Sequence, residues 1–107
     1  MREYVLHESG EKQAVTLAAG EELTIVLREN PTTGYRWELE LTGGAVSLAG
    51  SEYKPAGDAI GGGGARRFRL TASSAGVTAV RARLRRPWET DTAPLEERVL
   101  DVHVVQR

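Results

Sequence analysis

The sequence predicts an all-β protein built as a two-layered antiparallel sandwich. Apolar and polar residues alternate in several short segments, turn residues separate these segments, and no window shows a helical period. About seven such segments fit into the 107 residues, and Trp37 lies on the segment that follows the first long loop. These features favour an immunoglobulin-like topology in which residues 1–107 form one domain.

The N-terminal segments begin with a weak pattern and then alternate clearly. We interpret residues 4–17 as an edge strand in two pieces around a turn at 9–12. Residues 21–28 and 35–41 place apolar side chains on one face and charged ones on the other, as half-buried antiparallel strands do. The inward positions are Leu23, Ile25 and Leu27 in the first, and Tyr35, Trp37, Leu39 and Leu41 in the second.

The middle of the chain is predicted to be less regular than its C-terminal part. Val46 and Leu48 indicate a short strand, and residues 51–59 are expected to be irregular because Pro55 disfavours a long ladder. Alternation returns in residues 67–70, 77–85 and 95–105. The predicted core contains Leu23, Ile25, Leu27, Trp37, Phe68, Leu84 and Val102.

Bulk composition excludes several classes of function. The chain has no cysteine, so it has no disulfide, no thiolate metal site and no cysteine nucleophile. Its formal net charge of −1 gives no general attraction to nucleic acid or to an anionic membrane. No run is long and apolar enough for a signal peptide or a membrane span, which leaves a periplasmic, secreted or cytoplasmic location open.

Arginines alternate along two predicted strands and could form a nucleic-acid-binding face. They are Arg67, Arg69, Arg81, Arg83 and Arg85. In an immunoglobulin-like sheet, however, Glu38, Glu40, Glu97 and Asp101 would surround the last three, at about 0.2–1 kcal/mol for each cross-strand pair. We therefore expect a neutralised charge ladder and no nucleic-acid partner.

No catalytic or metal-binding constellation is found. His7 and His103 lie in strand-like segments without a second ligand at a recognisable spacing, so surface positions are expected for both. No Gly-x-Ser-x-Gly motif is present. We expect a protein that is not an enzyme and uses no cofactor.

The most informative stretch is the loop between the 21–28 and 35–41 segments. It consists of Asn30, Pro31, Thr32, Thr33, Gly34 and Tyr35. Pro31 fixes its own φ and keeps Asn30 out of the helical region, while Gly34 can adopt a positive φ. The result should be a stiff loop that offers hydroxyls, methyls and backbone polar groups to a partner, although the same residues also suit a simple turn.

Two further loops follow this one in order. The first contains Gly61, Gly62, Gly63 and Gly64, and lacks the lysine and the helix that a phosphate-binding loop needs. The second contains Arg86, Pro87 and Trp88. The ordered trio, NPTTGY, GxGG and RPW, resembles the chagasin-type inhibitors of cysteine peptidases, over about residues 15–105.

That resemblance implies a partner and a mode of binding. The chain would inhibit papain-like cysteine peptidases tightly, reversibly and without covalent chemistry, and would do so as a monomer. Thr32 and Thr33 would sit near the catalytic Cys-His pair, the glycines along the non-primed subsites, and Trp88 on an aromatic on the primed side. Gly62 at the variable position should make its loop more flexible, so ordering it costs more entropy. The alternative is an adhesive or carbohydrate-binding module that uses the same loop tips.

Overall fold

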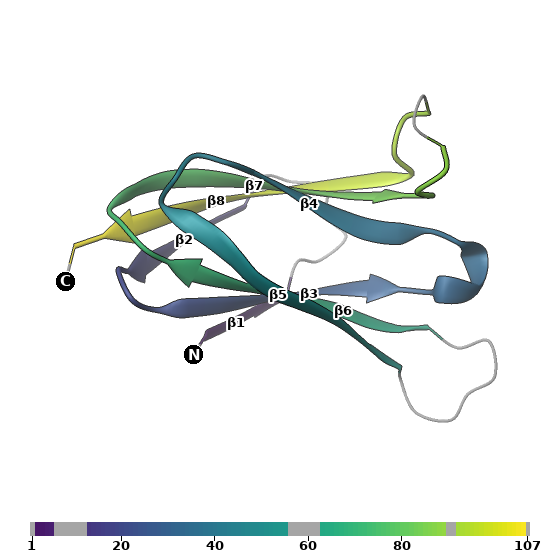
Figure 1. Ribbon diagram of the computed structural model, residues 1–107, viewed down its shortest axis with the longest axis horizontal. Coiled ribbons are helices and arrows are strands. Elements are labelled where there is room, and N and C mark those ends of the chain that lie inside the picture. Colours follow the sequence, from purple (N-terminus) through teal and green to yellow (C-terminus); the bar gives the residue numbers. More distant parts are fainter. Residues whose placement is uncertain (1, 6–12, 56–62, 90–91, 107) are drawn as a thin grey trace.

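Two four-stranded β-sheets pack face to face (Figure 1). The computed structural model describes residues 2–5, 13–55, 63–89 and 92–106. One sheet has the order β1-β3-β6-β5 and the other the order β2-β8-β7-β4. The strands are β1 (Arg2–Val5), β2 (Gln13–Ala18), β3 (Glu22–Glu29), β4 (Arg36–Thr42), β5 (Val46–Pro55), β6 (Gly64–Ala72), β7 (Gly76–Arg85) and β8 (Glu96–Val105).

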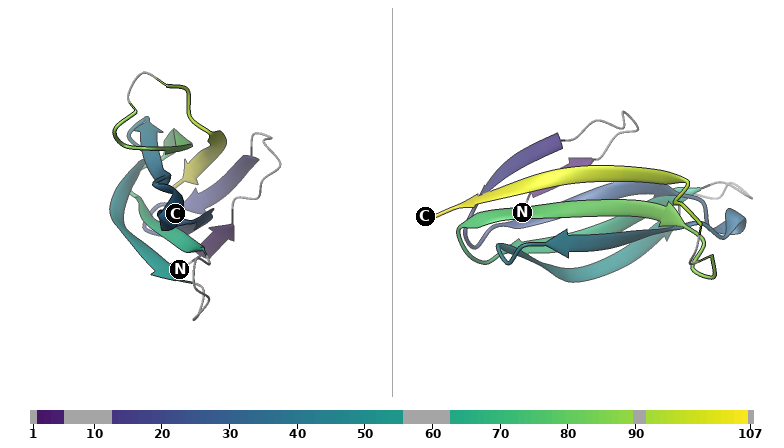
Figure 2. Two further views of the ribbon diagram at one scale, coloured as in Figure 1. Left: turned by 90° about the vertical axis from the view of Figure 1, so that its right-hand side faces the viewer. Right: turned by 90° about the horizontal axis from the view of Figure 1, so that it is seen from above.

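The predicted immunoglobulin-like β-sandwich is confirmed, with eight described strands where about seven were expected. The predicted two-piece edge strand corresponds to β1 and β2, which join different sheets (Figure 2). Both pair in parallel, β1 with β3 and β2 with β8. The turn expected at 9–12 lies outside the described residues, as does His7.

The core lies between the sheets and contains every residue predicted for it. Leu23, Ile25 and Leu27 from β3 face Val102 and other inward residues of β8 and β7, and Phe68 and Trp37 are buried beside them. The strict alternation of apolar residues along these strands explains this arrangement, since successive side chains point to opposite faces.

The expectation of an irregular segment at 51–59 is wrong for its first half. β5 continues through Ser51 to Pro55, and Pro55 pairs with Gly64 in β6. Pro55 is tolerated there because β5 is the edge strand of its sheet, so the missing N–H removes no inner ladder bond. The pairing of β5 with β6 has a register shift between Leu48 and Gly50, ahead of the segment that was expected to be irregular. Residues 56–59 lie outside the described residues.

The predicted charge ladder forms around Arg83. Its guanidinium lies 3.4 Å from Glu40 and 3.3 Å from Glu97, carboxylates on the two neighbouring strands. Arg81 is opposite Glu40 in the register of β4 and β7. The Arg85 guanidinium donates to the backbone carbonyls of Glu89 (3.3 Å) and Thr92 (3.1 Å) in the connection after β7.

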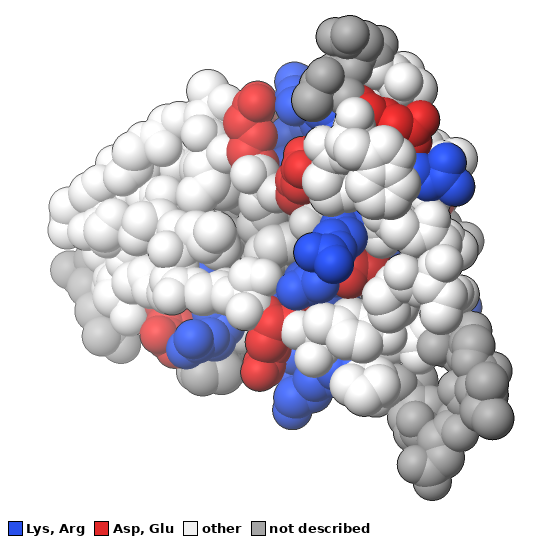
Figure 3. All heavy atoms as spheres, turned by 45° about the vertical axis from the view of Figure 1, so that its right-hand side comes forward, with Lys and Arg blue, Asp and Glu red and all other residues white. Residues whose placement is uncertain are grey.

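The C-terminal ends of β3, β5 and β7 lie at one end of the sandwich (Figure 1). The register places Glu29, Gly64 and Pro55 side by side in one sheet, and Arg36 beside Arg85 in the other. The connections after β3, β5 and β7 therefore leave from the same end. Charged side chains gather toward this end in Figure 3, whereas the opposite end, with the β4–β5 and β6–β7 turns, is uncharged in that view.

Candidate functional site

The central loop, residues 30–35, is a single 3₁₀ turn with a defined beginning and end. Asn30 is extended (φ −119°, ψ 103°), Pro31 occupies the first helical position, and Gly34 closes the turn with φ 82°. Thr33 N–H donates to Asn30 O (3.3 Å) and Gly34 N–H to Pro31 O (3.1 Å). The backbone constraints predicted for Asn30 and Gly34 are confirmed.

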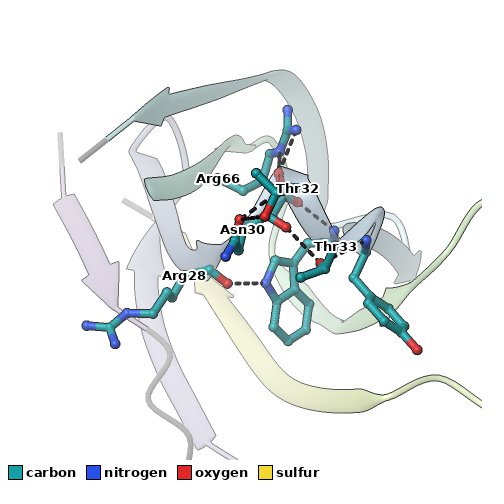
Figure 4. A network of polar contacts seen from close by, with 8 residues as sticks. Arg28, Asn30, Thr32, Thr33 and Arg66 are labelled. Atoms are coloured by element: carbon teal, nitrogen blue, oxygen red, sulfur yellow. Dashed lines mark hydrogen bonds and ion pairs between the residues drawn. The ribbon is translucent and has the colours of Figure 1, made fainter. Parts of the chain in front are cut away.

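The threonine hydroxyls hold the loop together, although Thr32 and Thr33 are both exposed. The Thr32 hydroxyl donates to Asn30 Oδ1 (2.7 Å), and the same oxygen accepts from Thr32 N–H (3.1 Å). The Thr33 hydroxyl donates to Asn30 O (2.8 Å) and accepts from Tyr35 N–H (3.3 Å). Figure 4 shows Asn30 at the centre of these bonds. The exposed loop therefore keeps its shape without a partner.

A buried carboxylate lies directly below the loop. The Glu29 side chain has no exposed surface, and Oε1 accepts from Trp37 N–H (2.8 Å) while Oε2 accepts from Arg66 Nη2 (2.8 Å) and Nε (3.2 Å). Arg66 also lies over the Tyr53 ring, 5.6 Å from its centroid. One side chain thus ties the ends of β3, β4 and β6 together.

Sequence reasoning missed Glu29, although a signal was present. Leu23, Ile25 and Leu27 face inward, and the same alternation places Glu29 on the core face. Arg98 in β8 repeats this pattern. It lies on the same inward face of its strand as Leu100 and Val102, and it is buried over the Trp37 ring. Glu29 and Arg98 are thus charged residues on the buried faces of their strands, and both lie at the end of the core that is next to the loops.

The tryptophan loop, residues 86–89, leans against the central loop. Arg86 Nε donates to Thr33 O (3.3 Å), and the Arg86 guanidinium lies 4.5 Å from the centroid of the Tyr35 ring. Trp88 is 69% exposed. Its ring nevertheless covers Gly34, because a Cβ on that glycine would lie 2.7 Å from Trp88 Cη2. Glycine is therefore required at position 34 for two reasons: the positive φ and the close approach of the Trp88 ring.

The described part of the glycine run also approaches the central loop. A Cβ on Gly63 would lie 3.1 Å from Glu29 O and 3.6 Å from the Asn30 side chain. Gly64 is enclosed by the backbone of β5, where a Cβ would lie 2.8 Å from Pro55 Cα. Gly61 and Gly62 lie outside the described residues. The structure thus brings the three predicted motifs together wherever it describes them.

This end of the molecule offers shape and hydrogen bonds, and no reactive group among the described residues. No set of three His, Asp or Glu side chains in the described ranges could hold a metal ion. His103 is exposed on β8, as expected. In the same ranges, no helix is long and apolar enough to cross a membrane.

Comparisons with known proteins agree with the geometry. Residues 16–104 match the family described as chagasin family peptidase inhibitor I42. Chagasin of Trypanosoma cruzi is 34% identical over 82 residues, covering 69% of this chain and 73% of the relative. The structure of the cysteine protease inhibitor EhICP2 from Entamoeba histolytica has a TM-score of 0.84 and 25% identity, covering 97% of this chain and 96% of that one. PbICP-C, solved in complex with falcipain-2, has a TM-score of 0.62 at 16% identity over the full length of both chains, a likeness of fold alone.

Proposed function

This chain belongs to the chagasin family of peptidase inhibitors, and we propose that it blocks the active-site cleft of papain-like cysteine peptidases with its three clustered loops. The protein is an inhibitor and not an enzyme. The binding residues would be those of the central loop, the glycines at 61–64 and the Arg86-Pro87-Trp88 motif. The whole chain would act as one domain.

The observation that carries this proposal is the self-braced central loop. A peptide bond is cleaved when it enters an active site as flexible, extended backbone. Here Asn30 O and Pro31 O accept hydrogen bonds within the turn, and the backbone is 3₁₀ rather than extended. Such a loop can occupy a cleft beside the catalytic pair without presenting a scissile bond in the required conformation.

The same bracing favours tight binding. A preformed loop loses little conformational entropy when it docks, since its hydroxyls and backbone are already fixed. The exposed Trp88 adds a large aromatic surface of the kind found at interface hot spots. Inhibition would be reversible because the chain has no thiol or electrophile.

The alternative, an adhesive or carbohydrate-binding module, is not favoured. An exposed tryptophan would also suit sugar stacking. Sugar binding, however, requires neither the match to a peptidase inhibitor family nor a hydrogen-bonded turn at the centre of the site.

A titration of papain tests the proposal directly. We expect stoichiometric loss of papain activity, recovery of activity on dilution, and an intact chain by mass spectrometry after release. Trypsin, whose nucleophile is a serine, is the control enzyme and should keep its activity. Cleavage between Asn30 and Tyr35 together with loss of inhibition would identify the chain as a substrate instead.

A further inference from the structure

An open cleft of about 370 Å³ lies beside the central loop. Asn30, Thr33 and Tyr35 of the central loop line it together with Arg86 of the tryptophan loop and Leu95, which precedes β8. We call it the interloop cleft. A partner that touches both loops spans the space between them, so the cleft is continuous with the proposed peptidase-binding surface.

The cleft has apolar walls. Leu84, a core residue at the end of β7, lines it, and Leu95 lies at its opening with 59% of its surface exposed. The backbone N–H of Leu95 donates to Leu84 O (2.8 Å), which holds the two leucines side by side. Exposed leucine beside a buried one offers apolar surface to an incoming side chain.

Most charges around the cleft are already engaged within the protein. Glu29 pairs with Arg66, Glu96 pairs with Arg98 (2.9 Å), and Arg86 pairs with Glu89 (3.5 Å).

Arg28 differs from these residues. Its side chain is exposed and points away from Thr32 and Thr33 in Figure 4, and no ion pair joins it to another described residue. Because Arg28 also lines the interloop cleft, the edge of the cleft carries a positive charge that is not engaged by the described part of the chain.

We propose that the interloop cleft binds an apolar side chain of the inhibited peptidase, and that a carboxylate next to that side chain pairs with Arg28. This inference rests on the proposed function and adds a specificity site beside the active-site cleft. A buried apolar anchor supplies affinity, whereas a rim charge mainly sets the rate and the salt dependence of association.

Substitutions at Leu95 and Arg28 test the inference with papain as the probe. Leu95→Asp removes an apolar wall and repels a carboxylate, and Leu95→Lys removes the wall but attracts one. Leu48→Asp is the matched control, because Leu48 is a 48% exposed leucine on β5, outside the cleft. Arg28→Gln is compared with Arg81→Gln, an exposed arginine on the outer face of β7.

We expect Leu95→Asp to weaken inhibition of papain about tenfold or more, and Leu95→Lys less than Leu95→Asp. Arg28→Gln should weaken inhibition about threefold at low salt and have no effect near 1 M salt, where screening is strong. Leu48→Asp and Arg81→Gln should stay within about twofold of the wild type. Melting temperatures of all variants should match, since the substituted side chains are exposed.

Equal inhibition by Leu95→Asp and Leu48→Asp would overturn the apolar site. A salt-independent or absent effect of Arg28→Gln would overturn the carboxylate partner. Both results require a wild-type protein that inhibits papain, so they differ from failure of the proposed function, in which the wild type itself does not inhibit.

Discussion

The central loop and the tryptophan loop lie against each other but are held in different ways. The central loop is fixed from within, by the Asn30 side chain and two threonine hydroxyls, and from below, by Glu29. The tryptophan loop is held from outside, by Arg86 on Thr33 O and by Arg85 on the carbonyls of Glu89 and Thr92. Its aromatic side chain remains mostly exposed.

This difference separates two requirements of a peptidase inhibitor. A segment placed beside catalytic groups has to keep a non-cleavable shape, and internal hydrogen bonds provide that. A segment that anchors the complex has to offer surface, which an exposed indole provides. Loss of bracing and loss of surface should therefore produce different defects.

The largest effect is expected from Glu29→Ala. This change leaves Arg66 and Trp37 N–H without their acceptor, and breaking a buried pair costs about 3–5 kcal/mol of folding stability. We expect a loss of folding stability near about 3 kcal/mol, because Arg66 keeps some access to water. Urea unfolding measures this loss. The central loop should also become a substrate, cut by papain between Asn30 and Tyr35.

Glu97→Ala is the matched control for Glu29→Ala. Its carboxylate pairs with Arg83 on an exposed sheet face, where such pairs contribute about 0–1 kcal/mol. Cleavage scattered over the whole Glu29→Ala chain, rather than within the loop, would mean that Glu29 serves global stability alone.

Trp88→Ala is expected to have the next largest effect, and on binding rather than on folding. Truncating an exposed hot-spot tryptophan should weaken inhibition of papain roughly thirtyfold, which corresponds to about 2 kcal/mol. The melting temperature should change little, because Trp88 is largely exposed. A melting temperature lowered by several degrees with unchanged inhibition would instead identify Trp88 as a cap on the sandwich.

The smallest effect is expected from Thr32→Ala. The substitution removes one neutral hydrogen bond, worth about 0.5–1.5 kcal/mol, while Asn30 Oδ1 still accepts from the residue 32 N–H. Inhibition constants for papain should rise about tenfold or less. Thr32→Trp and Thr32→Asp should be more harmful, because a bulky or charged side chain would have to fit beside the catalytic pair. Equal effects of all three would place Thr32 outside the contact.

Alternation of apolar residues was enough to predict the sandwich and its core, because Leu23, Ile25 and Leu27 can be buried together only on one face of a strand. Local backbone constraints also predicted the conformations of Asn30 and Gly34. The length of β5 was not predicted, since whether Pro55 is tolerated depends on its place at the sheet edge.

The bracing of the site could not be predicted from local sequence. The partners of Glu29 and Arg85 depend on which strands are neighbours and on where a loop backbone passes. The threonine hydroxyls bond within the loop because Asn30 presents acceptors within their reach. Only the position of Glu29 on an otherwise apolar face was available as a signal.

The parallel pairing of β2 with β8 has a consequence for how the protein is made. Residues 13–18 find their partners only at 100–105, so this sheet cannot be completed on the ribosome before the last strand has emerged. The β3–β6 and β4–β7 pairs can form earlier, but the β7–β8 pair that supports the tryptophan loop cannot. Such long-range pairing is typical of all-β domains that fold in milliseconds to seconds, and a nascent chain acquires its complete binding end last.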